Sequence, residues 1–87
     1  MQLIVSREAQ ADISDAVAYF GRISPILTVR FGVELESIYG SILATRISAA
    51  LLRRFPYSVF YIVDSRAVVI IGVVHQARDE DTWKRRA

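Results

Sequence analysis

The spacing of apolar residues in the first quarter of the chain predicts a short strand followed by an amphipathic helix. Residues 2–5 (QLIV) are suited to a strand, and Ser6 after them is a good helix N-cap. Glu8 falls in the first helical turn, where it complements the helix dipole. From there to about Arg22, apolar residues recur at three- and four-residue spacing, at Ala9, Ile13, Ala16, Val17 and Phe20.

A second helix is predicted directly after the first. Ser24 and Pro25 form a start signal, a capping serine followed by proline at the first helical position. The helix is expected to extend to about Ala44, with an apolar stripe at Leu27, Phe31, Leu35, Ile38 and Ile42. Because the connection is so short, the two helices should pack as an antiparallel hairpin.

The second half of the chain has the character of a β-sheet, because β-branched and aromatic residues replace the helical spacing after Thr45. Three strands are predicted, over residues 49–55, 57–64 and 67–75, with Asp64-Ser65-Arg66 as the turn between the last two. Pro56 marks a bend between the first two strands. Residues 76–87 are polar and predict either a short terminal helix or a flexible end.

These elements predict a single α+β domain over residues 1–87. The helix hairpin covers one face of a mainly antiparallel sheet, which three C-terminal strands complete, and the opening strand joins it at an edge. We expect Val59, Tyr61 and Val63 to face the helices, which leaves Phe60 and Ile62 on the open face. An exposed apolar patch of this kind is typical of a binding surface.

Composition narrows the possible functions. The 87 residues are 53% hydrophobic with a net charge of +2, and ten of the eleven basic residues are arginine, which suits phosphate or carboxylate recognition. With no cysteine and one histidine, we expect no metal and no other cofactor. The longest apolar stretch, residues 67–74, is far shorter than a membrane span, so we expect a cytoplasmic protein that does not bind membranes.

Two segments carry a resemblance to a known family. Residues 51–64 read LLRRFPYSVFYIVD and residues 68–83 read VVIIGVVHQARDEDTW, with a closing set of His75, Arg78, Asp79 and Trp83. Together with the order of the earlier elements, they resemble the RelE/ParE superfamily of type II toxin-antitoxin systems, most closely its ParE-like branch. The resemblance implies a growth-inhibiting toxin of the plasmid-stabilisation kind. It also implies a cognate antitoxin, whose C-terminal segment folds onto the toxin to form a hetero-oligomer.

The RelE-type branch of this family implies an endoribonuclease that cuts mRNA on the ribosome without a metal. Such chemistry needs groups that neutralise phosphate and transfer protons. The candidates here are Arg53, Arg54, Arg78 and His75, with Tyr61 as a hydrogen-bond donor. Nuclease members of the family generally add several lysines and a late tyrosine or histidine cluster, whereas this chain has one lysine and no tyrosine after Tyr61.

The ParE-type branch implies inhibition of a protein target, DNA gyrase, and this agrees better with the detailed match. It requires a surface rather than a catalytic set, with an aromatic anchor among arginines. The candidates for binding the target or the antitoxin are Arg53, Phe60, Ile62, Arg78, Trp83 and Arg85. A third possibility is a degenerate member that only binds its antitoxin, since the connection from Ile42 to Leu51 is shorter than in comparable members.

Several of these residues also have ordinary structural explanations. His75 ends a strand and is suited to a hydrogen-bonded structural role. Arg53 and Arg54 are adjacent, and one of them is expected to pair with an acid such as Asp64 or Glu36. Tyr57 and Tyr61 fit core positions, and Trp83 and the basic residues after it fit a solvated tail.

Overall fold

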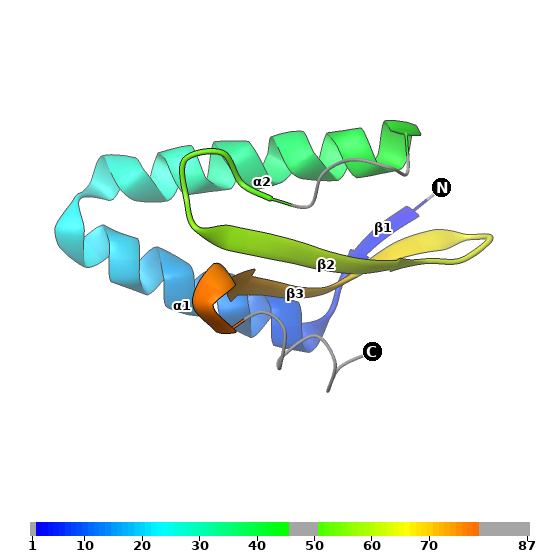
Figure 1. The fold of residues 1–87 in the computed structure, drawn as a ribbon, viewed down its shortest axis with the longest axis horizontal. Coiled ribbons are helices and arrows are strands. Elements are labelled where there is room, and N and C mark those ends of the chain that lie inside the picture. The colour runs from blue at the N-terminus through cyan, green and yellow to red at the C-terminus, as the bar shows by residue number, and fades with distance from the viewer. Residues whose placement is uncertain (1, 46–50, 79–87) are drawn as a thin grey trace.

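The computed structural model describes residues 2–45 and 51–78, and Figure 1 shows a helix hairpin lying along a small twisted sheet. The elements in chain order are β1 (Gln2–Val5), α1 (Arg7–Ile23), α2 (Pro25–Thr45), β2 (Tyr57–Val63), β3 (Ala67–His75) and the 3-10 helix η1 (Gln76–Arg78). The α+β class and the helix hairpin predicted from the sequence are confirmed.

Hydrogen bonds cap both ends of α1, and a single residue, Ser24, connects it to α2. Ser6 begins α1 as predicted, because its Oγ accepts a hydrogen bond from the Ala9 amide at 3.1 Å. At the other end, the Ser24 amide donates to the Phe20 carbonyl at 2.9 Å. Pro25, which has no amide hydrogen to lose, takes the first position of α2 and fixes the sharp reversal.

The described sheet has three strands in the order β1-β3-β2. β1 lies at an edge and pairs in parallel with β3, while β2 pairs with β3 in the antiparallel sense. The predicted edge position of the opening strand is therefore confirmed. The antiparallel ladder has a bulge, since Phe60 pairs with Gly72 and Tyr61 with Ile70.

The strand predicted over residues 49–55 is wrong for the part that the structure describes. Leu51 forms one isolated bridge with Ser58, and residues 53–56 form bends. This segment does not continue as a strand of the sheet, because the amides of Arg53 and Arg54 donate to the Glu34 carboxylate on α2, at 2.7 and 3.2 Å. Those amides cannot also donate to a neighbouring strand, and residues 49 and 50 lie outside the described residues.

Four aromatic side chains form the centre of the core, where the helix hairpin meets the sheet. The rings of Phe20, Phe31, Phe55 and Tyr57 pack with centroid separations of 4.9 to 5.9 Å. The predicted stripe of α2 is confirmed, since its members are either buried or packed against this core. On α1, Val17 is exposed although its spacing placed it on the buried stripe.

The predicted faces of β2 are confirmed near its start. Toward its end the difference in burial between the two faces becomes small. Val59 is fully buried and Tyr61 packs against the core, whereas Ile62 on the opposite face is 45% exposed. Val63 shares the core-facing side by alternation but is 40% exposed, because β2 ends there. The open face of the sheet thus carries apolar side chains that reach solvent.

The hairpin turn between β2 and β3 is fixed by Asp64. One of its carboxylate oxygens, Oδ1, accepts hydrogen bonds from the amides of Arg66 and Ala67, both at 2.8 Å. These two bonds hold the pKa of the Asp64 carboxyl below its ordinary value of 3.8. The predicted turn is confirmed, and its two hydrogen bonds favour the ionised carboxylate.

The lowered pKa of Asp64 predicts an acid-dependent contribution to stability. A carboxyl whose folded-state pKa is depressed stabilises the fold above its unfolded pKa and loses that effect as the pH falls through the folded pKa. We expect Asp64→Asn to unfold at lower urea concentration than the wild type at pH 6, and the difference to shrink below pH 3.8. A pH-independent difference between Asp64→Asn and the wild type would contradict the prediction.

Candidate functional site

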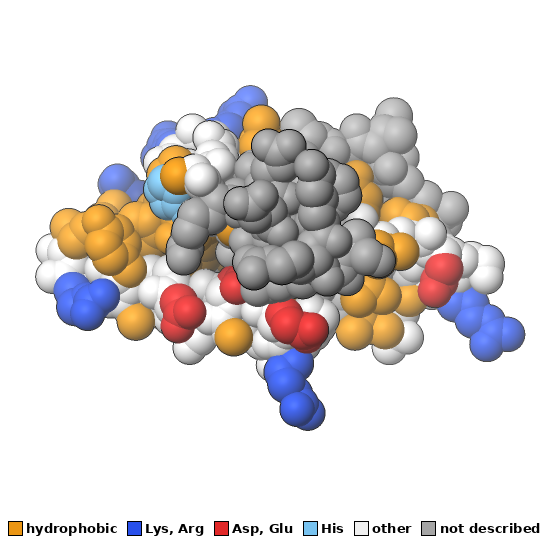
Figure 2. All heavy atoms as spheres, turned by 60° about the horizontal axis from the view of Figure 1, so that its bottom comes forward, with side chains coloured by type: hydrophobic (Ala, Val, Ile, Leu, Met, Phe, Trp, Pro, Cys, Tyr) orange, Lys and Arg blue, Asp and Glu red, His pale blue; other side chains and the backbone are white. Residues whose placement is uncertain are grey.

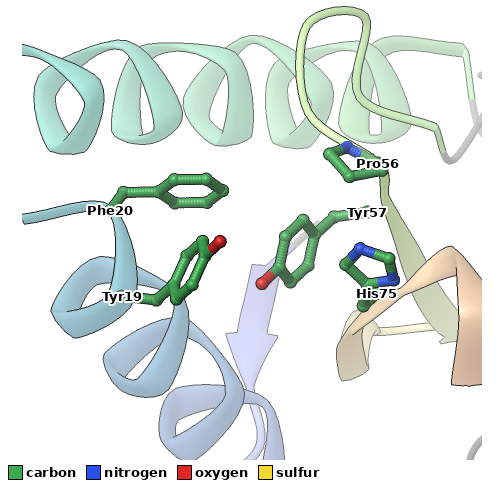
Figure 3. A pocket seen from close by; sticks show the side chains of 5 residues that line it. All are labelled: Tyr19, Phe20, Pro56, Tyr57 and His75. Carbon is green, nitrogen blue, oxygen red and sulfur yellow. The ribbon is translucent and has the colours of Figure 1, made fainter. Parts of the chain in front are cut away.

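An aromatic hollow of about 320 Å³ surrounds the end of β3 (Figure 3). Its lining residues are Tyr19, Phe20, Pro56, Tyr57 and His75. Tyr57 begins β2 and His75 ends β3, and the antiparallel register places them directly opposite each other. Figure 3 shows their rings side by side, with the two α1 aromatics across the opening.

His75 is held in this hollow by contacts on both sides of its ring. The imidazole packs edge-on against Tyr57, with ring centroids 5.4 Å apart, and its Nδ1 accepts a hydrogen bond from the Ala77 amide at 3.1 Å. These contacts match the structural role that the sequence offered as the ordinary explanation for His75.

Arg53 and Arg54 line a different hollow, of about 390 Å³, on the outer side of α2. Its described lining consists of Val29, Arg30, Val33, Glu34, Ser37, Arg53 and Arg54. The Glu34 carboxylate accepts the two backbone amides of the arginine pair, and the expected ion pair of one arginine side chain with Asp64 or Glu36 stays a prediction. Asp64 is engaged in the hairpin turn.

The candidate catalytic residues are not brought together within the described chain. The hollow at His75 and the hollow at Arg53 and Arg54 share no lining residue. The backbone of Arg78 lies in η1, three residues after His75, and its side chain lies outside the description. Trp83 and Arg85 also lie outside the described residues.

The open face of the sheet carries a row of apolar side chains across all three strands. Ile4 on β1 and Ile62 on β2 both pair with Val69 on the central strand, so the three side chains point to the same side. Ile4 and Ile62 are exposed and Val69 is half-buried. Phe60, which lies on the same face of β2, is half-buried. This row is the sheet surface that the sequence predicted for binding.

No basic side chain belongs to the described lining of the hollow at His75. Figure 2 shows apolar side chains beside this histidine. The described lining of the hollow consists of phenyl, phenol, proline and imidazole groups, none of which carries a permanent positive charge. A phosphate bound there would therefore meet hydrogen-bond donors but no guanidinium among these residues.

The described residues contain neither a cluster of metal ligands nor a helix that could span a membrane. Over residues 2–45 and 51–78, no three histidine, aspartate or glutamate side chains lie together in the way a metal site requires. Among the same residues, neither helix combines the length and the apolar character needed to cross a bilayer.

Comparison with known proteins supplies a match to the fold. No model of a protein family matches the sequence, and no curated protein does. Among solved structures, a chain described as "Chromosomal ParDE TA system from P. aeruginosa" aligns with a TM-score of 0.70. The alignment covers 86% of this chain and 95% of that chain, at 18% sequence identity. This chain therefore shares the fold of a chain from that ParDE system.

Three polar residues that the sequence did not single out have defined environments in this fold. Glu34 accepts the amides of Arg53 and Arg54, and Asp12 on α1 accepts the Val73 amide of β3 at 3.0 Å. The Tyr39 hydroxyl is buried with no hydrogen-bond partner in the described chain. Burial, and after it the nearby Glu36, raises the pKa of Tyr39 above its ordinary 10.0. Spacing in the sequence carries no signal for any of these long-range or buried contacts.

Proposed function

We propose that this chain is the toxin of a type II toxin-antitoxin module, neutralised by a cognate antitoxin and acting by binding and inhibiting a protein such as DNA gyrase. The observation that carries the proposal is the fold shared with a chain from a ParDE toxin-antitoxin system over 86% of this chain. Growth inhibition, plasmid stabilisation and action in the cytoplasm belong to the same proposal. Fold alone does not fix function, so the surfaces must supply the rest of the argument.

The exposed apolar row on the sheet supports an antitoxin partner. Ile4, Val69 and Ile62 form a continuous strip that solvent reaches at both edge strands. Covering such a strip removes apolar area from water, which favours association. A domain of 87 residues is stable by a narrow margin, and a partner that binds only the folded state stabilises it by mass action.

The arrangement around His75 supports inhibition by surface contact rather than catalysis. Nδ1 of the imidazole accepts the Ala77 amide, and Arg53 and Arg54, two of the three arginines that were candidates for neutralising a phosphate, line a separate hollow. An inhibitor that works by binding needs no such convergence of groups. Exposed apolar side chains and dispersed arginines are sufficient for it.

One observation favours the RelE-type alternative. The hollow at His75 is lined by aromatic rings and is large enough, at about 320 Å³, for a planar base to stack against Tyr19 or Tyr57. In that case His75 would lie beside the bound nucleotide as the candidate proton-transfer group. This candidate predicts mRNA cleavage that depends on His75, which the first proposal does not.

Expression of the chain in bacteria distinguishes these proposals. We expect growth arrest with induction of a DNA-damage reporter, relieved by co-expressing the product of a small neighbouring reading frame. We also expect mRNA in a ribosome-loaded extract to remain intact. Codon-positioned cuts that disappear in His75→Ala would favour the nuclease instead. Binding of the neighbour product without growth arrest or cleavage would identify a degenerate, antitoxin-binding member.

A further inference from the structure

The helix α2 is apolar on two opposite faces, and only one of them packs against the core. Phe31, Leu35 and Ile42 form the buried stripe. On the other side, Ile26 is 54% exposed, and Val29 and Val33 are each 64% exposed. These three fall at positions i, i+3 and i+7, which places them in one line along the helix. We call this line the outer face of α2.

The outer face continues toward the C-terminal end of α2 with small residues. Ser37 and Gly40 follow Val33 at the spacing of one helical face. A Cβ added to Gly40 would meet no other atom within 4 Å, so nothing in the described chain requires glycine there. Glycine inside a helix costs about 1 kcal/mol relative to alanine.

A basic rim borders the outer face of α2. The hollow of about 390 Å³ places Arg30, Arg53 and Arg54 beside the two exposed valines, with Glu34 as the acid in its described lining. The Glu34 carboxylate is already engaged by the amides of Arg53 and Arg54, at 2.7 and 3.2 Å. The charged residues of this lining are three arginines and one glutamate whose carboxylate is already engaged, so the lining carries a net positive charge.

We propose that the outer face of α2 binds an acidic amphipathic helix of the antitoxin, an inference that rests on the proposed function. Apolar side chains of that helix, at i, i+3 and i+7, would pack on Val29 and Val33 and over the low surface at Ser37 and Gly40. Carboxylates along one edge would meet the three guanidinium groups of the rim. This contact is separate from the apolar row on the open face of the sheet.

Charge argues for an acidic partner over a second copy of this chain. A two-fold contact through the outer face of α2 would bring two identical sets of Arg30, Arg53 and Arg54 toward each other. Like charges brought together at an interface oppose association. An acidic helix meets the same rim with attraction, and its affinity should fall as ionic strength rises.

Binding of the neighbouring reading frame's purified product to the full-length chain tests the proposal. We expect Val33→Asp and Arg54→Glu each to raise the dissociation constant more than about tenfold. The matched controls are Val17→Asp on α1 and Arg66→Glu in the hairpin turn, which should bind within about twofold of the wild type. All four positions are exposed, so thermal unfolding of the variants should resemble that of the wild type.

The possible outcomes separate this inference from the proposed function. Tight binding by the wild type that Val33→Asp and Arg54→Glu leave unchanged would overturn the outer face of α2 as the docking surface, while the toxin-antitoxin proposal would stand. Weakened binding by Val17→Asp or Arg66→Glu to the same extent would also overturn it. No binding by the wild type would overturn the proposed function and this inference with it. A self-associating chain whose dimer is broken by Val33→Asp would identify a second copy as the occupant and contradict the proposal.

Discussion

Replacing Phe31 by alanine is expected to lower the free energy of unfolding by about 3–5 kcal/mol. Phe31 is fully buried, and its ring packs against Phe20, Phe55 and Tyr57 at centroid distances of 5.2 to 5.6 Å. The truncation leaves a cavity where the two helices and the sheet meet, so the lost contacts belong to all three layers. Since a small domain has about 5–15 kcal/mol in total, the loss is a large fraction of it.

Urea unfolding followed by circular dichroism measures this effect. Phe31→Leu is the matched control, because it keeps most of the side-chain volume and should lose clearly less stability than the alanine variant. An alanine variant within about 1 kcal/mol of the wild type would mean that the aromatic cluster is not the centre of the core.

Replacing Asp12 by alanine is expected to lower the free energy of unfolding by about 1–3 kcal/mol. Its Oδ2 accepts a hydrogen bond from the amide of Val73, a residue that is almost fully buried in β3. Removing the carboxylate leaves that N–H without this acceptor in a place that water reaches poorly. The bond joins residues 61 positions apart, so it also ties α1 to the central strand.

Amide hydrogen exchange at Val73 reports this contact directly. Exchange should be faster in Asp12→Ala, and Asp12→Asn should recover part of the protection, since its side-chain oxygen can still accept the bond. Asp15→Ala, an exposed position on the same helix, is the control for loss of a charge. Equal protection of Val73 in the wild type and in Asp12→Ala would contradict the assignment.

The parts of the fold that the sequence predicted correctly depend on local signals. The start of α1 at Ser6 and the hairpin at Ser24 and Pro25 follow from capping preferences that act within one turn. The buried stripe of α2 follows from its periodicity, and the two faces of β2 follow from strict alternation. In each case the decisive atoms belong to neighbouring residues.

The parts that the sequence missed depend on contacts between distant residues. Residues 51–55 have the composition of a strand, but the carboxylate of Glu34, about twenty positions earlier, takes two of their amides. The acceptor role of Asp12 depends in the same way on where α1 crosses β3. Neither contact leaves a periodic trace in the sequence, because only the folded chain brings the partners together.

Only part of the candidate site could be predicted from the sequence, because the rest depends on contacts between distant residues. The end of β3 at His75 and the exposure of Ile62 followed from strand boundaries and alternation. The separation of His75 from Arg53 and Arg54 did not, since it depends on the path of residues 51–56 past α2.

The stoichiometry of inhibition tests the central claim most directly. Purified DNA gyrase is titrated with the purified chain while supercoiling is measured, and ribosome-bound mRNA is followed in a parallel reaction. An inhibitor that acts by binding should reduce supercoiling in proportion to the amount added, reaching completion near equimolar chain, and leave the mRNA intact. Cleavage of the mRNA by far less than equimolar chain, with supercoiling unaffected, would contradict the account.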